Sequence, residues 1–238
     1  MIRLKQVSKT YKNKVTALTD ISLTIDQGEF VYLVGQSGSG KSSLMKLLYG
    51  KEYPTQGYVV VGSRVVNQIK ANHLHLLRRE VGIVFQEFHL LPQKTVYENV
   101  AYVLEVTGHS TASIEEKVMD ALTTVGLKHK ALDFPSQCSG GEQQRVAIAR
   151  AIVHRPGILI ADEPTGNLDP KTGYDMLKLL HKINKTGTTV IMATHDYSFV
   201  ERMPSRVIEL NKGKIKSDRS KNHTLLLYSM KTGDYFVV

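Results

Sequence analysis

The segment that most constrains the fold of this chain is the glycine-rich stretch Gly35-Gln36-Ser37-Gly38-Ser39-Gly40-Lys41-Ser42. It follows the apolar run 30–34, which is rich in β-forming residues, and precedes 43–49, which has helical periodicity and stops at Gly50. A strand, a glycine loop and a helix in this order are typical of the phosphate-binding P-loop, because glycines let the backbone wrap a phosphate and the helix N-terminus adds positive charge. The sequence therefore predicts a site for a nucleoside triphosphate and Mg²⁺.

The loop residues have distinct expected roles. Lys41 is expected to reach the β- and γ-phosphates, and the Ser42 hydroxyl is expected to ligate Mg²⁺. A chance glycine turn is disfavoured, because both the strand and the helix are in place. We expect the other members of the loop and the residue after it to bind the nucleotide: Gly35, Ser37, Gly38, Ser39, Gly40 and Ser43.

Composition is that of an ordinary globular protein. The chain has 238 residues, of which 42% are hydrophobic, enough for one large α/β domain or a domain with a subdomain. No apolar run approaches the ~18 residues of a membrane helix, and the N-terminus lacks the apolar core of a signal peptide. The one cysteine, Cys138, excludes an internal disulfide and is typical of a reducing compartment. Any membrane role is therefore expected to come through a partner or the surface.

The net charge is +9, and basic residues are crowded in a stretch near the C-terminal end. Basic residues there are interpreted as a solvated surface or as an attraction to anionic lipid headgroups or nucleic acid. No nucleic-acid recognition motif is present, so no nucleic-acid partner is expected. The histidines form no Cys/His cluster, so a structural zinc site is not expected either. The basic residues are Lys212, Lys214, Lys216, Arg219 and Lys221, with Asp218 among them.

The rest of the chain predicts alternating strands and helices. Alternating apolar residues near Ile2 and Leu23 predict early strands, and 59–66 predicts a hairpin turning at Gly62-Ser63, so a small antiparallel sheet is expected beside the P-loop strand. Helical patterns cover about 70–80, 112–155 and Tyr174 to Asn184. The apolar runs 158–161 and 189–193 between helices are typical of a parallel sheet covered on both faces. We expect an α/β fold with a mainly parallel core sheet flanked by helices.

Two carboxylates and a histidine follow these apolar runs. Ligands bind at the carboxyl ends of strands in open parallel sheets. Asp162 is therefore expected to hold Mg²⁺ through water, and Glu163 to polarise the attacking water. His195 is expected to reach the γ-phosphate region. The alternatives are an acidic helix cap for the pair and a structural role for the histidine.

A second anion site is predicted at Ser139-Gly140-Gly141-Glu142, where a further helix begins and runs to about His154. Ser139 and Glu142 have capping-box spacing, and the two glycines expose backbone N–H groups at the helix start. One chain has little need of two such sites for one triphosphate. We therefore expect a head-to-tail homodimer in the nucleotide-bound state, in which this helix start contacts the nucleotide held by the other subunit.

Together these motifs resemble those of ATP-binding cassette (ABC) ATPases over about residues 1–220. The resemblance implies an ABC-type ATPase that binds ATP and Mg²⁺ and releases ADP and phosphate. It implies that Tyr11 stacks on adenine and that Gln86 is a catalytic and metal-site residue; a strand aromatic and a surface amide are the alternatives. It also implies Ser139 to Gln143 as the signature, Asp162 and Glu163 as Walker B and general base, Asn167-Leu168-Asp169 as the D-loop and His195 as the switch histidine.

The chain departs from the family pattern at two positions. Cys138 stands where the signature usually begins with Leu, and Ser43 stands where a Thr usually follows the P-loop. We interpret Cys138 as inert packing, although its position at a helix start could lower its pKa. The hydroxyl of Ser43 is retained.

Four segments show a narrower resemblance to the FtsE family of cell-division ATPases: Leu76 to Gly82, Phe85 to Pro92, Lys94 to Val100 and Gly126 to Lys130. It implies an FtsX-like or permease-like integral membrane partner that docks near Gln86, activation of peptidoglycan hydrolases, and a peripheral location on the cytoplasmic face of the plasma membrane. The stretch 163–169 is shared with lipoprotein-releasing and macrolide- or peptide-exporting ATPases, which remain the alternative.

Two other functional classes also stay open. A soluble ABC ATPase acting on nucleic acid or ribosomes would generally carry a second cassette or a long coiled coil. A nucleotide-gated scaffold with negligible hydrolysis would not need Glu163 and His195. We expect one ABC ATPase domain over 1–222, with a helical subdomain at about 88–155, and a tail at 223–238 that could pair as a hairpin.

Overall fold

The computed structural model describes residues 1–220 and divides the chain into two compact units. Unit 1 comprises Met1–Arg78 together with the chain from Thr189 onward, and unit 2 comprises Arg79–Thr188. The segment expected to form a helical subdomain, about 88–155, belongs to unit 2. The tail 223–238, where a hairpin is expected, lies outside the described residues. Within residues 1–220, none of the helices has the length and apolar character needed to span a membrane.

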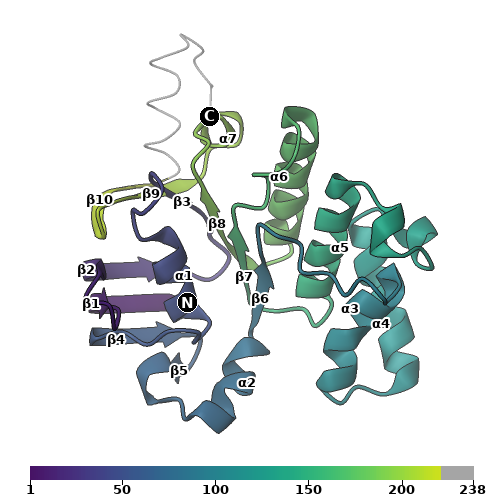
Figure 1. Cartoon of the computed structure of the whole chain (residues 1–238), viewed down its shortest axis with the longest axis horizontal. Coiled ribbons are helices and arrows are strands. Elements are labelled where there is room, and N and C mark those ends of the chain that lie inside the picture. Colours follow the sequence, from purple (N-terminus) through teal and green to yellow (C-terminus); the bar gives the residue numbers. More distant parts are fainter. Residues whose placement is uncertain (221–238) are drawn as a thin grey trace. The chain divides into compact units, whose positions relative to one another are not determined.

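Unit 1 contains a four-stranded antiparallel sheet of order β2-β1-β4-β5 (Figure 1). Ile2 and Leu4 are buried on one face of β1 and pair with Ile25 and Leu23 of β2. The turn between β4 and β5 falls at Gly62-Ser63. The early strands and the hairpin expected from the sequence are therefore confirmed. The strands are β1 (Ile2–Thr10), β2 (Thr16–Ile25), β4 (Gln56–Val61) and β5 (Arg64–Val65).

Four further strands of unit 1 lie in the order β10-β9-β3-β8. β3 (Phe30–Val34) pairs in parallel with β8 (Thr189–Thr194) and β9 (Arg206–Asn211), and β10 (Lys214–Arg219) is antiparallel to β9. Every residue of β3 and β8 is buried, which is typical of strands covered on both faces. The helices of unit 1 are α1 (Lys41–Leu48), α2 (Leu74–Arg78) and α7 (Ser198–Arg202). The strand and the helix predicted on either side of the glycine loop are thus present.

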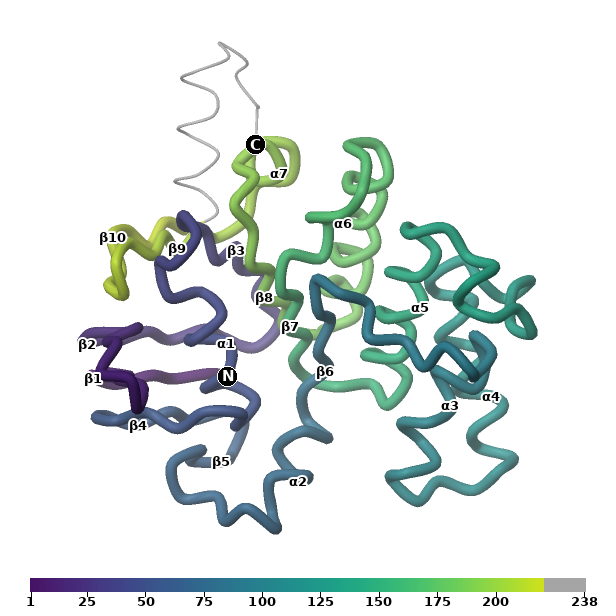
Figure 2. The backbone as a smooth tube through the Cα atoms, in the orientation of Figure 1, coloured from purple at the N-terminus to yellow at the C-terminus, as the bar shows by residue number. Residues whose placement is uncertain are grey.

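Unit 2 contains one parallel strand pair and four helices. β6 (Val81–Val84) pairs with β7 (Ile158–Asp162), which is the apolar run predicted before the two carboxylates. Three of the helices pack against one another, and the tube in Figure 2 follows them as neighbours: α3, α4 and α5. The helices are α3 (Val96–Val106), α4 (Thr111–Thr124), α5 (Gly140–Ile152) and α6 (Pro170–Lys185).

The stretch 112–155, expected to be mostly helical, contains two helices separated by a long irregular segment. Helix α4 ends before Gly126, whose φ of 76° is left-handed and stops the helix. Pro135 then begins a short 3-10 turn, and α5 starts only at Gly140. The expected helical stretch was too long, because apolar spacing persists through this segment while its backbone turns twice.

Helix α3 was not delimited by apolar periodicity, although the sequence carries its start signal. Thr95 Oγ1 accepts a hydrogen bond from the Glu98 N–H at 3.2 Å, and the Glu98 carboxylate accepts one from the Thr95 N–H at 2.7 Å. This is a capping box, whose T-x-x-E spacing is visible in the sequence.

Asn99 of α3 fixes the backbone that precedes this helix. Its side chain is fully buried, and its Oδ1 accepts from the Leu91 N–H at 2.8 Å. Its Nδ2 donates to the carbonyls of Leu91, Lys94 and Thr95. The segment 91–95 is therefore held by one buried amide.

We expect Asn99→Ala to lower the free energy of unfolding by about 2–4 kcal/mol, because it leaves several partly buried backbone groups without a partner. Urea unfolding followed by circular dichroism measures the change. Asn72→Ala, at an exposed asparagine, is the control and should have little effect. A loss no larger than that of the control would contradict the role assigned to Asn99.

Candidate active site

In unit 1 the glycine loop joins the end of β3 to the start of α1. Lys41, the first residue of α1, is only 6% exposed. Its ammonium donates to the carbonyl of Gly35 at 2.6 Å and to that of Gln36 at 3.3 Å. These bonds keep the positive charge beside the backbone of the loop, whereas the Ser42 side chain is exposed.

The loop is packed so closely that two of its glycines have no room for a side chain. A Cβ at Gly35 would lie 2.4 Å from the Leu210 carbonyl oxygen of β9, and one at Gly40 would lie 2.8 Å from a carbonyl oxygen of β2. Gly213, in the turn between β9 and β10, donates its N–H to the Ser39 carbonyl at 3.0 Å. The loop is therefore fixed by β2 on one side and by the β9–β10 turn on the other.

Ser39 has a buried side-chain hydroxyl that is available to donate a hydrogen bond. The residue is 5% exposed, and its hydroxyl has no hydrogen-bond partner among residues 1–220. A buried hydroxyl without a partner costs about 1–3 kcal/mol. A phosphate oxygen is a strong acceptor, and helix N-termini such as that of α1 favour it. The loop thus fits a bound phosphate.

His195 leaves its strand at the same edge as the glycine loop. β3 and β8 are parallel, with Val34 level with Thr194, so Gly35 and His195 follow neighbouring strand ends. The turn is held by Thr194 Oγ1, which accepts from the Asp196 N–H at 3.0 Å. The His195 side chain is exposed. Its position at the strand end is the one that the sequence predicts.

Tyr11 lies beside the start of α1. It follows β1 directly, and its hydroxyl is 3.1 Å from Oγ of Ser43, the third residue of α1. The ammonium of Lys9 lies 5.0 Å from the centroid of its ring. Unit 1 therefore contains Tyr11, Lys41, Ser43 and the end of the strand that precedes His195.

In unit 2, β6 and β7 end at the same edge and are each followed by predicted site residues. Val84 is level with Ala161, so Gln86 and the Asp162-Glu163 pair leave neighbouring strand ends. Glu163 adopts a φ of 47°, a left-handed conformation that is uncommon outside glycine. Such backbone strain is concentrated at functional positions in proteins.

The turn after Glu163 lies against Gln86. The Gly166 N–H donates to the Glu163 carbonyl at 3.1 Å, and Asn167 Nδ2 donates to the Gln86 carbonyl at 3.4 Å. The structure therefore brings Gln86 into contact with the turn that carries the candidate general base.

Ser139 and Glu142 of the predicted signature form a capping box at the N-terminus of α5. The Glu142 N–H donates to Ser139 Oγ at 3.3 Å, and the Ser139 N–H donates to the Glu142 carboxylate at 2.8 Å. The bond from the Ser139 backbone is the main reason that the pKa of Glu142 is lowered. The N–H groups of Gly140 and Gly141 lie in the first turn, where a helix has no internal acceptors, so the helix start can offer them to an anion.

Cys138 packs immediately before this cap. The residue is 7% exposed, and burial raises the pKa of its thiol. The suggestion that the helix start lowers this pKa is therefore wrong. Cys138 behaves as a small apolar residue at the position where Leu is usual.

Sequence reasoning missed Arg150, which links α5 to the segment after Gln86. The guanidinium donates to the Phe88 carbonyl at 2.9 Å and to the His89 carbonyl at 2.7 Å, and burial lowers the pKa of Arg150. Helical periodicity indicates which face of α5 is buried, but it cannot identify what a partly buried arginine contacts. No sequence signal for this link was available.

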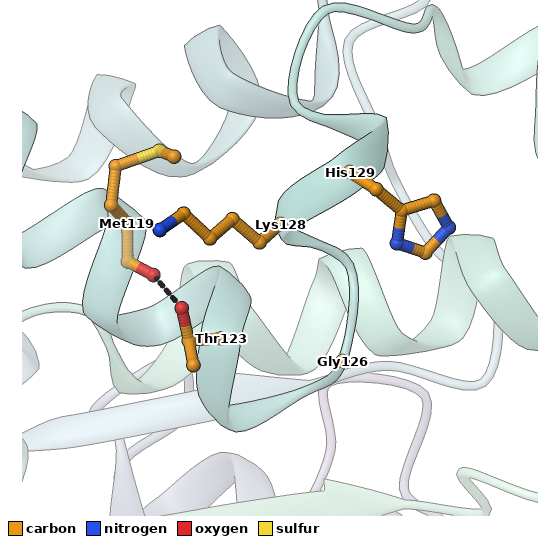
Figure 3. Close-up of a pocket in the computed structure, with 5 residues that line it drawn as sticks. All are labelled: Met119, Thr123, Gly126, Lys128 and His129. Atoms are coloured by element: carbon orange, nitrogen blue, oxygen red, sulfur yellow. Dashed lines mark hydrogen bonds between the residues drawn. The ribbon is translucent and has the colours of Figure 1, made fainter.

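A surface pocket of about 570 Å³ in unit 2 contains none of the predicted site residues. Thr123 Oγ1 donates to the Met119 carbonyl at 2.7 Å. In Figure 3 the Lys128 side chain extends toward Met119, and the His129 ring points away from it. The pocket is lined by Met119, Thr123, Gly126, Lys128 and His129.

The basic stretch on β10 is partly neutralised. Lys216 lies 2.8 Å and Arg219 3.8 Å from the Glu209 carboxylate, and Arg206 pairs with Asp218 at 2.7 Å. These ion pairs weaken the argument for a strong attraction to anionic lipid.

Comparisons with known proteins identify the family. A family model described as ABC transporter matches residues 18–166. The cell division ATP-binding protein FtsE of Bacillus subtilis is 51% identical, over 93% of this chain and 97% of its own length. The proteins described by the same name are 54% identical in Mycobacterium tuberculosis, over 93% of this chain and 96% of theirs, and 45% identical in Escherichia coli K12, over 90% and 96%.

Solved structures agree in fold. The dimeric ATP-binding cassette MJ0796, in a post-hydrolysis state bound to ADP and Pi, matches with a TM-score of 0.84 and 36% identity over 93% of this chain and 99% of that one. Another dimeric structure of that cassette matches with a TM-score of 0.84, 38% identity and the same coverage. The resemblance drawn from the motifs and the expected α/β cassette fold are both confirmed. This chain therefore belongs to the ABC transporter family as an ATP-hydrolysing cassette, and within that family to the FtsE group.

Proposed function

We propose that this chain is the ATP-hydrolysing motor subunit of a membrane complex in bacterial cell division and acts as a homodimer closed around two ATP. The observation that carries the proposal is that the chain has two separate helix starts suited to an anion, the P-loop with its buried Ser39 hydroxyl and the capped signature at Ser139. Similarity to cell-division proteins over nine tenths of the chain supports the assignment to cell division. Export of lipoproteins or macrolides is not favoured by these relatives.

The P-loop binds the phosphates of ATP in this proposal. Lys41 bonds the β- and γ-phosphates, while Ser39 and the backbone of the loop satisfy other phosphate oxygens. The Ser42 hydroxyl, the Asp162 carboxylate and the Gln86 amide are the oxygen ligands that would hold Mg²⁺, which when bound would neutralise phosphate charge. Tyr11 stacks on the adenine.

Three side chains act in hydrolysis: Glu163, Lys41 and His195. Glu163 accepts a proton from the attacking water as general base. Lys41 and His195 stabilise the charge that develops on the γ-phosphate. The left-handed backbone at Glu163 fixes the direction in which its side chain leaves the strand.

The signature acts on the nucleotide of the partner subunit. Ser139 Oγ accepts the cap bond from Glu142, so its hydroxyl hydrogen remains to be donated to a phosphate oxygen. The first-turn N–H groups of Gly140 and Gly141 add to this donor set. In the closed dimer the γ-phosphate is bound by both subunits. Its loss after hydrolysis removes this link, and the dimer reopens.

The segment after Gln86 is the proposed docking site for an FtsX-like integral membrane protein. Arg150 fixes the backbone of this segment at Phe88 and His89, and Asn99 fixes it from Leu91 onward. Because the segment is held in this way, it transmits a movement of Gln86 to the docked partner. The chain then sits peripherally on the cytoplasmic face of the plasma membrane. Contact of β10 with anionic lipid contributes less to membrane binding than the protein partner does. Nucleic acid is not a partner in this proposal.

We expect Glu163→Gln to reduce ATP turnover by at least about 10²-fold while ATP binding is retained, because it removes the general base but not the phosphate cradle. Phosphate release and calorimetry measure the two quantities. Lys41→Ala is the contrasting variant and should lose tight ATP binding. Turnover of Glu163→Gln within a few-fold of wild type would show that another group is the base.

The dimer is tested on the same Glu163→Gln protein, which should be monomeric without nucleotide and dimeric with saturating ATP and Mg²⁺ in gel filtration with light scattering. Adding Gly140→Asp should abolish the dimer but keep ATP affinity, because it places a negative charge at the signature helix start. The nearest atom to a Cβ at Gly140 is 3.9 Å away, so the substitution is accommodated. A persistent monomer with ATP, or a dimer despite Gly140→Asp, would contradict the model of closure.

Affinity purification from detergent-solubilised membranes of a bacterium that expresses the tagged chain tests the partner. An integral membrane protein of the FtsX type should co-purify and be identified by mass spectrometry. Leu90→Glu, in the docking segment, should lose it, whereas Val106→Glu, at a residue that is 61% exposed on α3, should not. Recovery of an exporter permease instead would overturn the cell-division assignment.

A further inference from the structure

We infer that Lys9 is a positioning residue for the base of the nucleotide: its ammonium covers one face of the Tyr11 ring and prepares the opposite face to stack on a purine. The inference rests on the proposed role of Tyr11 as the base-stacking aromatic. All residues involved belong to unit 1.

Lys9 is a buried cation with defined partners. It is 9% exposed at the end of β1, and its ammonium donates to the Glu52 carboxylate at 2.7 Å and to the Tyr53 carbonyl at 2.9 Å. Lysine is almost never this buried unless its charge is paired. The two bonds hold the ammonium in one place rather than letting it move in solvent.

The ammonium lies 5.0 Å from the centroid of the Tyr11 ring, within the distance at which a cation and an aromatic face attract. The edge of the ring is fixed by its hydroxyl, 3.1 Å from Ser43 Oγ. The backbone of Tyr11 is also fixed, because its N–H donates to the Val15 carbonyl at 2.9 Å. The ring is thus held at one face, at its hydroxyl and at its main chain.

These contacts tie the ring to both ends of α1, the helix that begins at the phosphate loop. Ser43 lies in the first turn of α1. Glu52, the partner of Lys9, follows the other end, where its N–H donates to the Lys46 carbonyl at 3.2 Å. Any phosphate bound at the start of α1 is therefore held in register with the ring.

A fixed cation on one face of Tyr11 changes what the opposite face can bind. The faces of two aromatic rings are both negative, so parallel stacking is opposed by their quadrupoles. An ammonium on the far face draws electron density from the ring and reduces this repulsion. The ring is also ordered before binding, which lowers the entropic cost of stacking. Both effects concern the base and leave the phosphates unaffected.

Calorimetric titration with ADP and with inorganic pyrophosphate, both with Mg²⁺, separates these contributions without hydrolysis. Lys9→Met should weaken ADP binding by about three- to tenfold, the range of a partly buried cation–π contact, and leave pyrophosphate binding unchanged. Lys9→Arg should restore most of the ADP affinity, since a guanidinium also stacks on aromatic faces. Lys5→Met, at an exposed lysine of the same strand, controls for loss of charge.

A double-mutant cycle with Tyr11→Leu shows whether Lys9 acts through the ring. Tyr11→Leu alone should weaken ADP binding, and Lys9→Met added to it should have no further effect. ADP affinity unchanged by Tyr11→Leu would overturn the base-stacking role itself. If Tyr11→Leu weakens ADP binding but Lys9→Met does not, only the inference about Lys9 is overturned.

An equal loss of ADP and pyrophosphate affinity in Lys9→Met would also overturn the inference, because Lys9 would then act on the fold or on general charge. If Lys9→Met does not fold, Glu52→Gln provides the second measurement. It removes the charge that fixes the ammonium and should weaken ADP binding in the same direction by a smaller factor. Unchanged ADP affinity in Glu52→Gln would count against the inference.

Discussion

The close approach of the glycine loop to its neighbouring backbone is the constraint on which the rest of unit 1 depends. Because a side chain at Gly35 or Gly40 would collide with a carbonyl oxygen of β9 or β2, the loop can follow only one path from β3 into α1. That path sets where Lys41 begins the helix and where the Ser39 hydroxyl is buried. Tyr11 in turn takes its position from Ser43 of the same helix. The positions of the residues proposed to bind the phosphates and the base thus depend on these two close backbone approaches.

Each unit of the chain carries part of the set of residues proposed to bind or hydrolyse ATP. Unit 1 contains Lys41, Ser42, Tyr11 and His195, and unit 2 contains Glu163 with its turn and the signature at α5. Each group is organised by its own strand ends and helix start, so each is formed within one unit.

Local features were predictable from the sequence, and long-range contacts were not. The P-loop, the strand ends before Glu163 and His195, and the capping box at Ser139 depend on residues close together in the chain, and all have the expected local structure. The start of α3 carried the same kind of signal at Thr95. The pairing of Lys9 with Glu52 joins positions 43 residues apart, and that of Arg150 with Phe88 joins positions 62 apart. No periodicity or spacing encodes such pairs, because they exist only once the sheet and the helices have packed.

An acidic residue inside a helix start that is proposed to bind an anion needs an explanation, and the geometry at Glu142 supplies one. Its carboxylate accepts the Ser139 N–H and lies 3.5 Å from the Lys130 ammonium, so its charge is directed to groups of its own unit. The pKa of Glu142 is lowered by these bonds, so the group adds stability above its pKa in the unfolded chain. That contribution is lost only as the pH falls through the lower pKa of the folded state. At neutral pH the carboxylate is therefore ionised and engaged in the cap, and the N–H groups of Gly140 and Gly141 remain available for a phosphate.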